Sequence, residues 1–157
     1  MTLALRALGA LLVLALAAPG AAHAQQAEVA FGGIRADTSL PVEVTADTLS
    51  VNQTDGTATF SGNVLVVQGD MRLSAERVEV VYGSADRSRI ERLHASGQVA
   101  LVSGKDAAEA ADAVYTIDSG AVEMTGNVLL TQGANTIAGQ KLVVDLASGT
   151  GRMEGRV

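Results

Sequence analysis

The amino-acid sequence predicts an elongated all-β roll, and an internal repeat together with an alternation of apolar residues carries this prediction. The stretches Thr59–Gly69, Ala95–Gly104 and Glu123–Gly133 are nearly the same, and a fourth copy, Arg152–Val157, begins before the chain ends. The copies share one glycine, at positions Gly62, Gly97, Gly126 and Gly155, which are 35, 29 and 29 residues apart. A repeat of this length indicates stacked copies of one supersecondary unit, each burying its apolar face on the next.

The first residues have the pattern of a secretory signal peptide. Met1–Arg6 carries one positive charge, Ala7–Ala18 is an apolar run, and Ala22–Ala24 matches a small-residue cleavage site. The run is shorter than a membrane span requires, so we expect cleavage after Ala24 and export, with a retained anchor as the alternative. The expected organisation is a signal peptide over residues 1–24, a partly irregular segment over 25–40 and one repeat domain over 41–157.

The first half of each repeat alternates with a period of two. In the first copy Ala58, Phe60, Gly62, Val64 and Val66 share one parity, while the intervening positions are mainly polar. One apolar face at this period is typical of a half-buried strand, and the Val-, Leu- and Thr-rich composition fits strands of about 5–9 residues.

The second half of each repeat has the opposite parity, as Val78, Val80 and Tyr82 show, and a further copy lies upstream at Thr45–Val51. A slip of one residue turns every side chain to the other face, so a bulge or corner must absorb the offset. The candidate positions are the polar pairs Asp47–Thr48, Glu76–Arg77, Ala111–Asp112 and Gln140–Lys141. We therefore expect strands bent into a V, with both arms facing one interior.

The segment Ala107–Ala113 favours a helix when it is considered alone, because alanine and glutamate are strong helix formers. In the repeat register it takes a position that is strand in the other copies. We expect a strand, weakened by its alanines.

Composition gives little support to catalysis. The chain has a formal net charge of −6 and no cysteine, which argues against nucleic acid as a partner and excludes disulfides. His94 is the one histidine that would remain after cleavage, and its parity faces outward. Gly97–Lys105 lacks the spacing of a phosphate-binding loop, and no calcium-loop pattern occurs. We expect no enzyme, no cofactor and no metal site.

The aliphatic interior leaves two interpretations open. It is either an ordinary dry core or a groove between two strand arms that admits acyl chains, each buried CH₂ contributing about 0.8 kcal/mol. A shortage of bulky aromatic residues is compatible with both.

The pairing of Thr59–Gly69 with Met71–Val80, preceded by Asp37–Asp47, resembles the OstA/LptA family of periplasmic lipopolysaccharide-transport proteins. The resemblance covers about residues 34–157. It implies a β-jellyroll of stacked antiparallel strands, a groove for the lipid A portion of lipopolysaccharide, and a periplasmic bridge from the inner to the outer membrane. It also implies as partners an inner-membrane-anchored bridge component and the outer-membrane lipopolysaccharide-assembly protein, with directionality from an ATPase complex. The alternatives are a self-assembling β-solenoid without lipid transport and a relative of the periplasmic domain of that assembly protein.

Carried onto this sequence, the resemblance and the parity together give candidate lipid-facing residues. These are Phe60, Val64, Val66, Val78, Val80, Val99, Leu101, Met124, Val128, Leu130, Leu142 and Val144. The two ends of the repeat region carry complementary half-copies, which predicts head-to-tail strand addition. The candidate edge residues are Val42 and Val44 at one end and Met153, Gly155 and Val157 at the other. Phe31–Gly33 resembles Phe60–Gly62, but Arg35 and Asp37 interrupt the pattern, so the N-terminal edge is degenerate.

Overall fold

A computed structural model describes residues 27–30 and 34–157, and it confirms the all-β prediction. The predicted signal peptide and the segment Phe31–Gly33 lie outside the described residues. The described part contains ten strands and no helix. The strands are β1 (Ala27–Ala30), β2 (Glu43–Thr45), β3 (Thr48–Asn52), β4 (Thr57–Gln68), β5 (Met71–Tyr82), β6 (Ile90–Ser103), β7 (Asp106–Thr116), β8 (Ala121–Gln132), β9 (Asn135–Asp145) and β10 (Thr150–Glu154).

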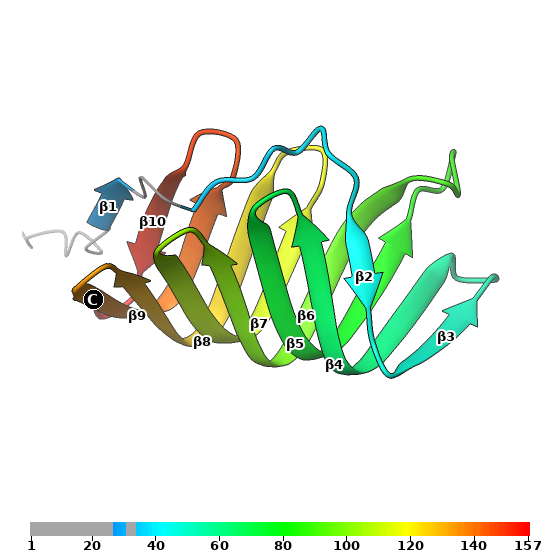
Figure 1. The fold of residues 1–157 in the computed structure, drawn as a ribbon, viewed down its shortest axis with the longest axis horizontal. Coiled ribbons are helices and arrows are strands. Elements are labelled where there is room, and N and C mark those ends of the chain that lie inside the picture. The colour runs from blue at the N-terminus through cyan, green and yellow to red at the C-terminus, as the bar shows by residue number, and fades with distance from the viewer. Residues whose placement is uncertain (1–26, 31–33) are drawn as a thin grey trace, which may run out of the picture.

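All ten strands belong to one antiparallel sheet, which runs along the long axis of the molecule in Figure 1. From β4 to β10 each strand pairs with the next one in the chain. At one end, β2 and β3 both pair with β4 and act as a single strand interrupted at Ala46 and Asp47. At the other end, β1 returns to pair with β10. Strand β1 therefore lies beside the C-terminal strand β10 and not beside the first repeat.

A corner crosses every long strand at the predicted level. Ser61 pairs with Arg77 but Val64 pairs with Ala75, so Gly62 and Asn63 stand opposite the single residue Glu76. Burial in β5 changes parity at the same place, between Ala75 and Val78. The predicted polar pairs thus mark the corner. The extra residue of the bulge lies in the neighbouring strand, which carries the repeated glycine. Since each strand continues through its corner, β4 to β9 are 11 to 14 residues long, longer than expected.

The repeated glycine is required by this corner. Gly62 has φ +80° and the following Asn63 has φ +47°, a left-handed conformation that residues with a Cβ rarely adopt. A Cβ on Gly62 would also lie 2.6 Å from Oδ2 of Asp47, and one on Gly126 would lie 2.8 Å from Cβ of Ala111. Backbone conformation and close approach together explain why each copy has glycine here.

The alanine-rich segment is strand β7, so the helical alternative is wrong and the repeat register is confirmed. Its residues Ala108, Ala110 and Ala113 are buried. Hydrogen bonding to β6 and β8 on both sides outweighs a local helix preference that is worth only tenths of a kcal/mol per residue.

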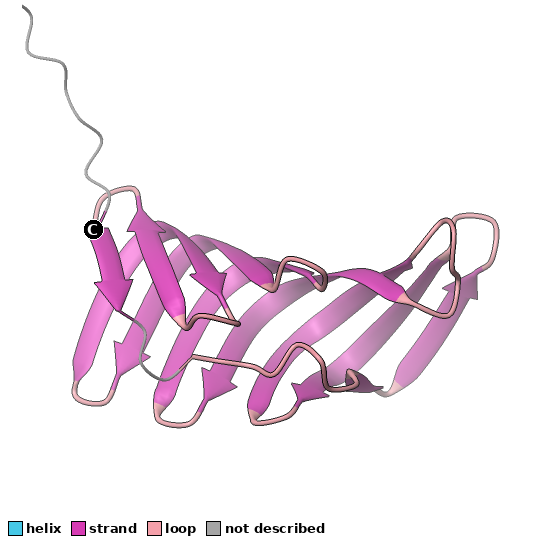
Figure 2. Ribbon diagram, turned by 90° about the horizontal axis from the view of Figure 1, so that it is seen from above, coloured by secondary structure: helices cyan, strands magenta, loops and turns pink. Residues whose placement is uncertain are grey.

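The apolar parity of all the long strands faces one interior, which extends through the stacked repeats. Figure 2 shows the roll from above, with the strands side by side along its length. Charged residues occupy the outer surface, and none of the charged residues that the structure describes is buried. The fold is therefore a V-bent sheet wrapped around a single aliphatic core.

Candidate functional site

The structure brings the candidate lipid-facing residues together in the interior. Eleven of them have at most 1% of their surface exposed, and Phe60 is partly buried against the same cluster. They come from β4 to β6, β8 and β9, so each repeat contributes to one apolar volume. In the free protein these side chains pack together as a core.

A segment that sequence reasoning missed closes this interior. Residues 34–42, here called the strap, run along the length of the roll between β1 and β2 (Figure 1). Ile34 is fully buried in the core, and Ala36 and Val42 pack against it. The amide of Ala36 donates a hydrogen bond of 3.1 Å to the carbonyl of Leu146. The strap thus supplies apolar side chains to the same interior as the repeats.

Two buried polar side chains hold the strap. The amide nitrogen Nε2 of Gln68 donates to the carbonyl of Leu40 at 2.9 Å, and the hydroxyl of Ser103 donates to the carbonyl of Arg35 at 2.9 Å. The Ser103 oxygen also accepts from the amide of Arg35 at 3.4 Å. Among the described residues these are the two buried polar positions, with 1% and 4% of their surface exposed. Both therefore serve the strap backbone.

These anchors occupy one position of the repeat. Gln68, Ser103 and Gln132 each lie six residues after the shared glycine and end β4, β6 and β8. In the first copy this position has the parity of Val64 and Val66, so a polar residue stands where an apolar one is expected. That mismatch was the signal in the sequence that could have located the anchors.

The Tyr115 phenol connects the Gln68 side chain to the interior of the roll. Its hydroxyl donates to Oε1 of Gln68 at 2.6 Å, and Tyr115 is 3% exposed. Burial raises the pKa of the Tyr115 phenol, an effect that the hydrogen bond to Gln68 partly opposes. The phenol stays protonated at neutral pH and fixes the orientation of the Gln68 amide.

A cavity of about 460 Å³ opens at the end of the roll beside β3. Leu49, Val51, Phe60 and Tyr82 contribute its apolar lining, and Arg87 lies at its polar side. Leu49 and Val51 are 56% and 59% exposed, so this end presents aliphatic surface to solvent. Such exposed apolar surface is typical of a binding or docking region.

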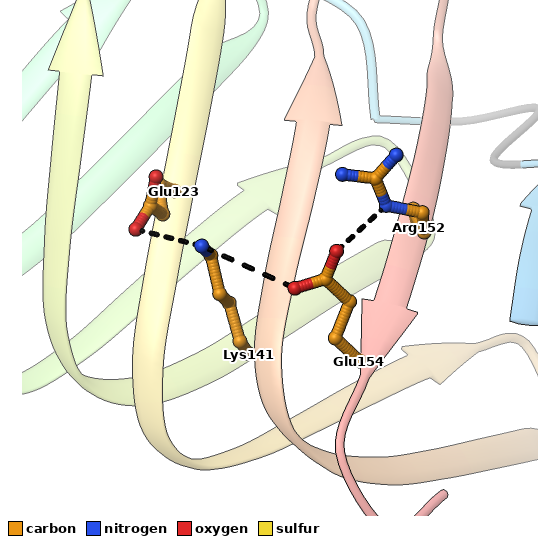
Figure 3. A network of polar contacts seen from close by, with 4 residues as sticks. All are labelled: Glu123, Lys141, Arg152 and Glu154. Atoms are coloured by element: carbon orange, nitrogen blue, oxygen red, sulfur yellow. Dashed lines mark hydrogen bonds and ion pairs between the residues drawn. The ribbon is translucent and has the colours of Figure 1, made fainter. Parts of the chain in front are cut away.

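The charged groups of the outer face form ion pairs. In Figure 3, Lys141 of β9 lies between Glu123 of β8, at 3.3 Å, and Glu154 of β10, at 4.0 Å, and Arg152 contacts Glu154 at 2.9 Å. These residues are partly exposed, and such pairs contribute about 0–1 kcal/mol each. The network belongs to the outer surface of the last three strands.

His94 also lies outside, about half exposed, with Nε2 3.7 Å from the carboxylate of Asp112. No group of three or more His, Cys, Asp or Glu side chains that could hold a metal ion occurs in the described part of the chain. The histidine is a solvated surface residue with an acidic neighbour.

The candidate edge residues lie in unequal environments. Val42 and Val44 are partly buried at the β2 end. Met153 is fully buried, and its strand β10 pairs with both β9 and β1, while Gly155 and Val157 follow the end of that strand. The edge of β10 is therefore covered by β1 and is not open as the sequence suggested.

An elongated antiparallel sheet closed around one apolar interior, with its charges on the outside, is the architecture of a β-jellyroll. The family comparison agrees, because the model of the LptA/(LptD N-terminal domain) LPS transport protein family matches residues 43–150. The chain belongs to this family. Its members are transport proteins and not enzymes.

Known relatives support the same assignment. An uncharacterised protein of Rhizobium meliloti (strain 1021) is 30% identical, over 97% of this chain and 83% of the relative. The lipopolysaccharide export system protein LptA of Escherichia coli (strain K12) is 28% identical, over 69% of this chain and 62% of its own length.

The fold also matches a solved structure. LptH of Pseudomonas aeruginosa is described as the LptA homologous periplasmic component of the lipopolysaccharide transport device, and it superposes with a TM-score of 0.67 at 22% identity. The match covers 78% of this chain and 87% of LptH, which identifies the roll as an LptA-like β-jellyroll. In the part of the chain that the structure describes, no helix is long and apolar enough to cross a membrane.

Proposed function

We propose that this chain is a periplasmic carrier that binds the acyl chains of lipopolysaccharide and forms part of the bridge to the outer membrane. The single observation that supports this most strongly is the apolar interior shared by all repeats. An amphiphile with several acyl chains gains about 0.8 kcal/mol for each CH₂ that it buries, and needs no charged site inside the roll.

In the proposed transport, lipid moves along the length of the interior. Because every repeat presents the same face, an acyl chain leaving one repeat meets an equivalent surface in the next. The cavity beside β3, with exposed Leu49 and Val51, supports this end as the place where lipid first contacts the roll. No chemical reaction is involved, and direction comes from partner components of the transport system.

The bridge requires contacts between ends. β2 and β3 pair only with β4 among the described strands, so their outer edges can accept another strand. The opposite end offers β10 once β1 is displaced. Val42 and Val44 on one side, and Met153, Gly155 and Val157 on the other, are the proposed contact regions for a second copy or for the membrane components.

Site-specific photo-crosslinking tests the carrier function. A photoreactive residue at Val64 or Val128, both 1% exposed on the inner face, is expected to form adducts with lipopolysaccharide in Gram-negative cells. The matched controls are Leu65 and Leu129, the next residues on the opposite face, which should give few adducts. Equal yields from both faces, or none from either, would contradict the carrier and favour a structural β-solenoid.

A further inference from the structure

The strap is attached to the roll far more lightly than any strand. Among the described residues, the strap makes one backbone-to-backbone hydrogen bond to the repeat domain, from Ala36 to Leu146, and one internal bond, from the amide of Leu40 to the carbonyl of Asp37. The other hydrogen bonds that the structure describes between the strap and the repeat domain involve the side chains of Gln68 and Ser103, while Ser39 bonds to Asp37 within the strap. A segment with few backbone bonds opens at a much lower free energy than the paired strands beneath it.

The strap nevertheless buries apolar surface in the proposed lipid interior. Ile34 is fully buried in the cluster that includes Val66 and Leu101, and Val42 packs on its margin. An acyl chain offers the interior the same kind of surface. The two are therefore chemically equivalent occupants of one apolar volume.

The hydrogen bonds from Gln68 and Ser103 suit a reversible contact between the strap and the roll. Gln68 and Ser103 bond to backbone carbonyls, so the clamp depends on the path of the strap and not on its side chains. When the strap leaves, both side chains stand at strand ends, where water can reach them.

We propose that the strap, residues 34–42, is a displaceable lid that closes the interior of the free protein and leaves it when acyl chains bind. The inference rests on the proposed lipid binding and adds to it how access is controlled. The free protein occupies its own site, and the ligand shifts the population toward the open form. The clamp of Gln68 and Ser103 sets how readily this happens.

Trypsin provides a direct test on the whole exported chain. Arg35 lies within the strap, its amide and carbonyl both held by Ser103, and the next basic residue in the chain is Arg72. We expect the Arg35–Ala36 bond to resist cleavage in the free protein and to be cut at least tenfold faster with purified lipopolysaccharide. Lipopolysaccharide stripped of its acyl chains is the control and should leave the rate unchanged. Unchanged cleavage with bound intact lipid would overturn the lid.

A disulfide that pins the strap gives the reverse test. A Cβ on Gly120 would lie 3.4 Å from Cγ2 of Thr38, which makes T38C and G120C a candidate pair for a disulfide, although Gly120 has φ +68° and its replacement adds backbone strain. The chain has no other cysteine. We expect the oxidised double variant to lose lipopolysaccharide binding and the reduced form to regain it, while each single variant binds under both conditions.

The outcomes separate the two proposals. Equal binding by the oxidised and reduced forms refutes the lid but keeps the carrier, whereas no binding by wild type and by every variant refutes the carrier itself. Should the pair fail to form, Q68A combined with S103A is expected to accelerate Arg35 cleavage without lipid and to speed lipid uptake. The exposed S74A on β5 is the matched control, and equal rates in both variants would also refute the lid.

Discussion

Truncation of Leu101 tests whether the interior of the free protein is a packed core. Leu101 is fully buried in the middle of the sheet, and its partners across the neighbouring strands are Leu73 and Ala108. Leu101→Ala removes three carbons, worth about 2.4 kcal/mol of transfer free energy. The small Ala108 cannot fill the hole, so a cavity term raises the expected loss to about 3–4 kcal/mol.

The assay is urea unfolding of the lipid-free protein followed by circular dichroism, with equal slopes for variant and wild type. The adjacent Val102→Ala is the matched control, because Val102 is 39% exposed on the opposite face of β6. Its expected cost is about 0.5 kcal/mol. A loss below about 1 kcal/mol for Leu101→Ala would refute the reasoning, because it would mean an open, solvated groove in which this side chain has few contacts to lose.

Three further predictions follow from the corner, the strap and the buried phenol. Gly126→Ala should destabilise the fold by at least about 1 kcal/mol more than Gly104→Ala in urea unfolding, because both have positive φ but only Gly126 has a neighbour in the way. Hydrogen bonds from Ser39 lower the pKa of Asp37 below its ordinary 3.8, so its support of the strap turn holds at neutral pH and is lost as pH falls through the lowered pKa. Amide hydrogen exchange in the strap should therefore be faster below this lowered pKa than above it. Asp37→Asn should remove that pH dependence. Since burial raises the pKa of Tyr115 above its ordinary 10.0, an alkaline absorbance titration should show a late phenol step that Tyr115→Phe abolishes. A phenol step unchanged by that substitution would contradict the buried contact.

The repeated part of the fold could be predicted because each of its features occurs several times. The parity of Val64 and Val66 recurs in every copy, and the corner at Glu76–Arg77 follows from two parities that must share one interior. Even the alanine-rich β7 was assigned correctly once its register was considered. Periodicity works here because stacked strands repeat the same packing problem.

The strap could not be predicted on those grounds. Its path has no period, since Arg35 and Asp37 point away while Ile34 enters the core. Its position depends on single hydrogen bonds to Gln68 and Ser103 from strands far along the chain. In the sequence, the only trace of such a contact is one polar residue at a position that is otherwise apolar. A single exception of this kind does not form a pattern from which a contact can be predicted.

Two different parts of the N-terminal region cover the interior and the edge of β10. The strap closes the roll lengthwise, and β1, which precedes it in the chain, pairs with β10. A free β10 edge would be a site for uncontrolled strand addition, so β1 protects this edge in the free protein. In the bridge proposed above, the edge of β10 therefore becomes available to a second copy only when β1 leaves it.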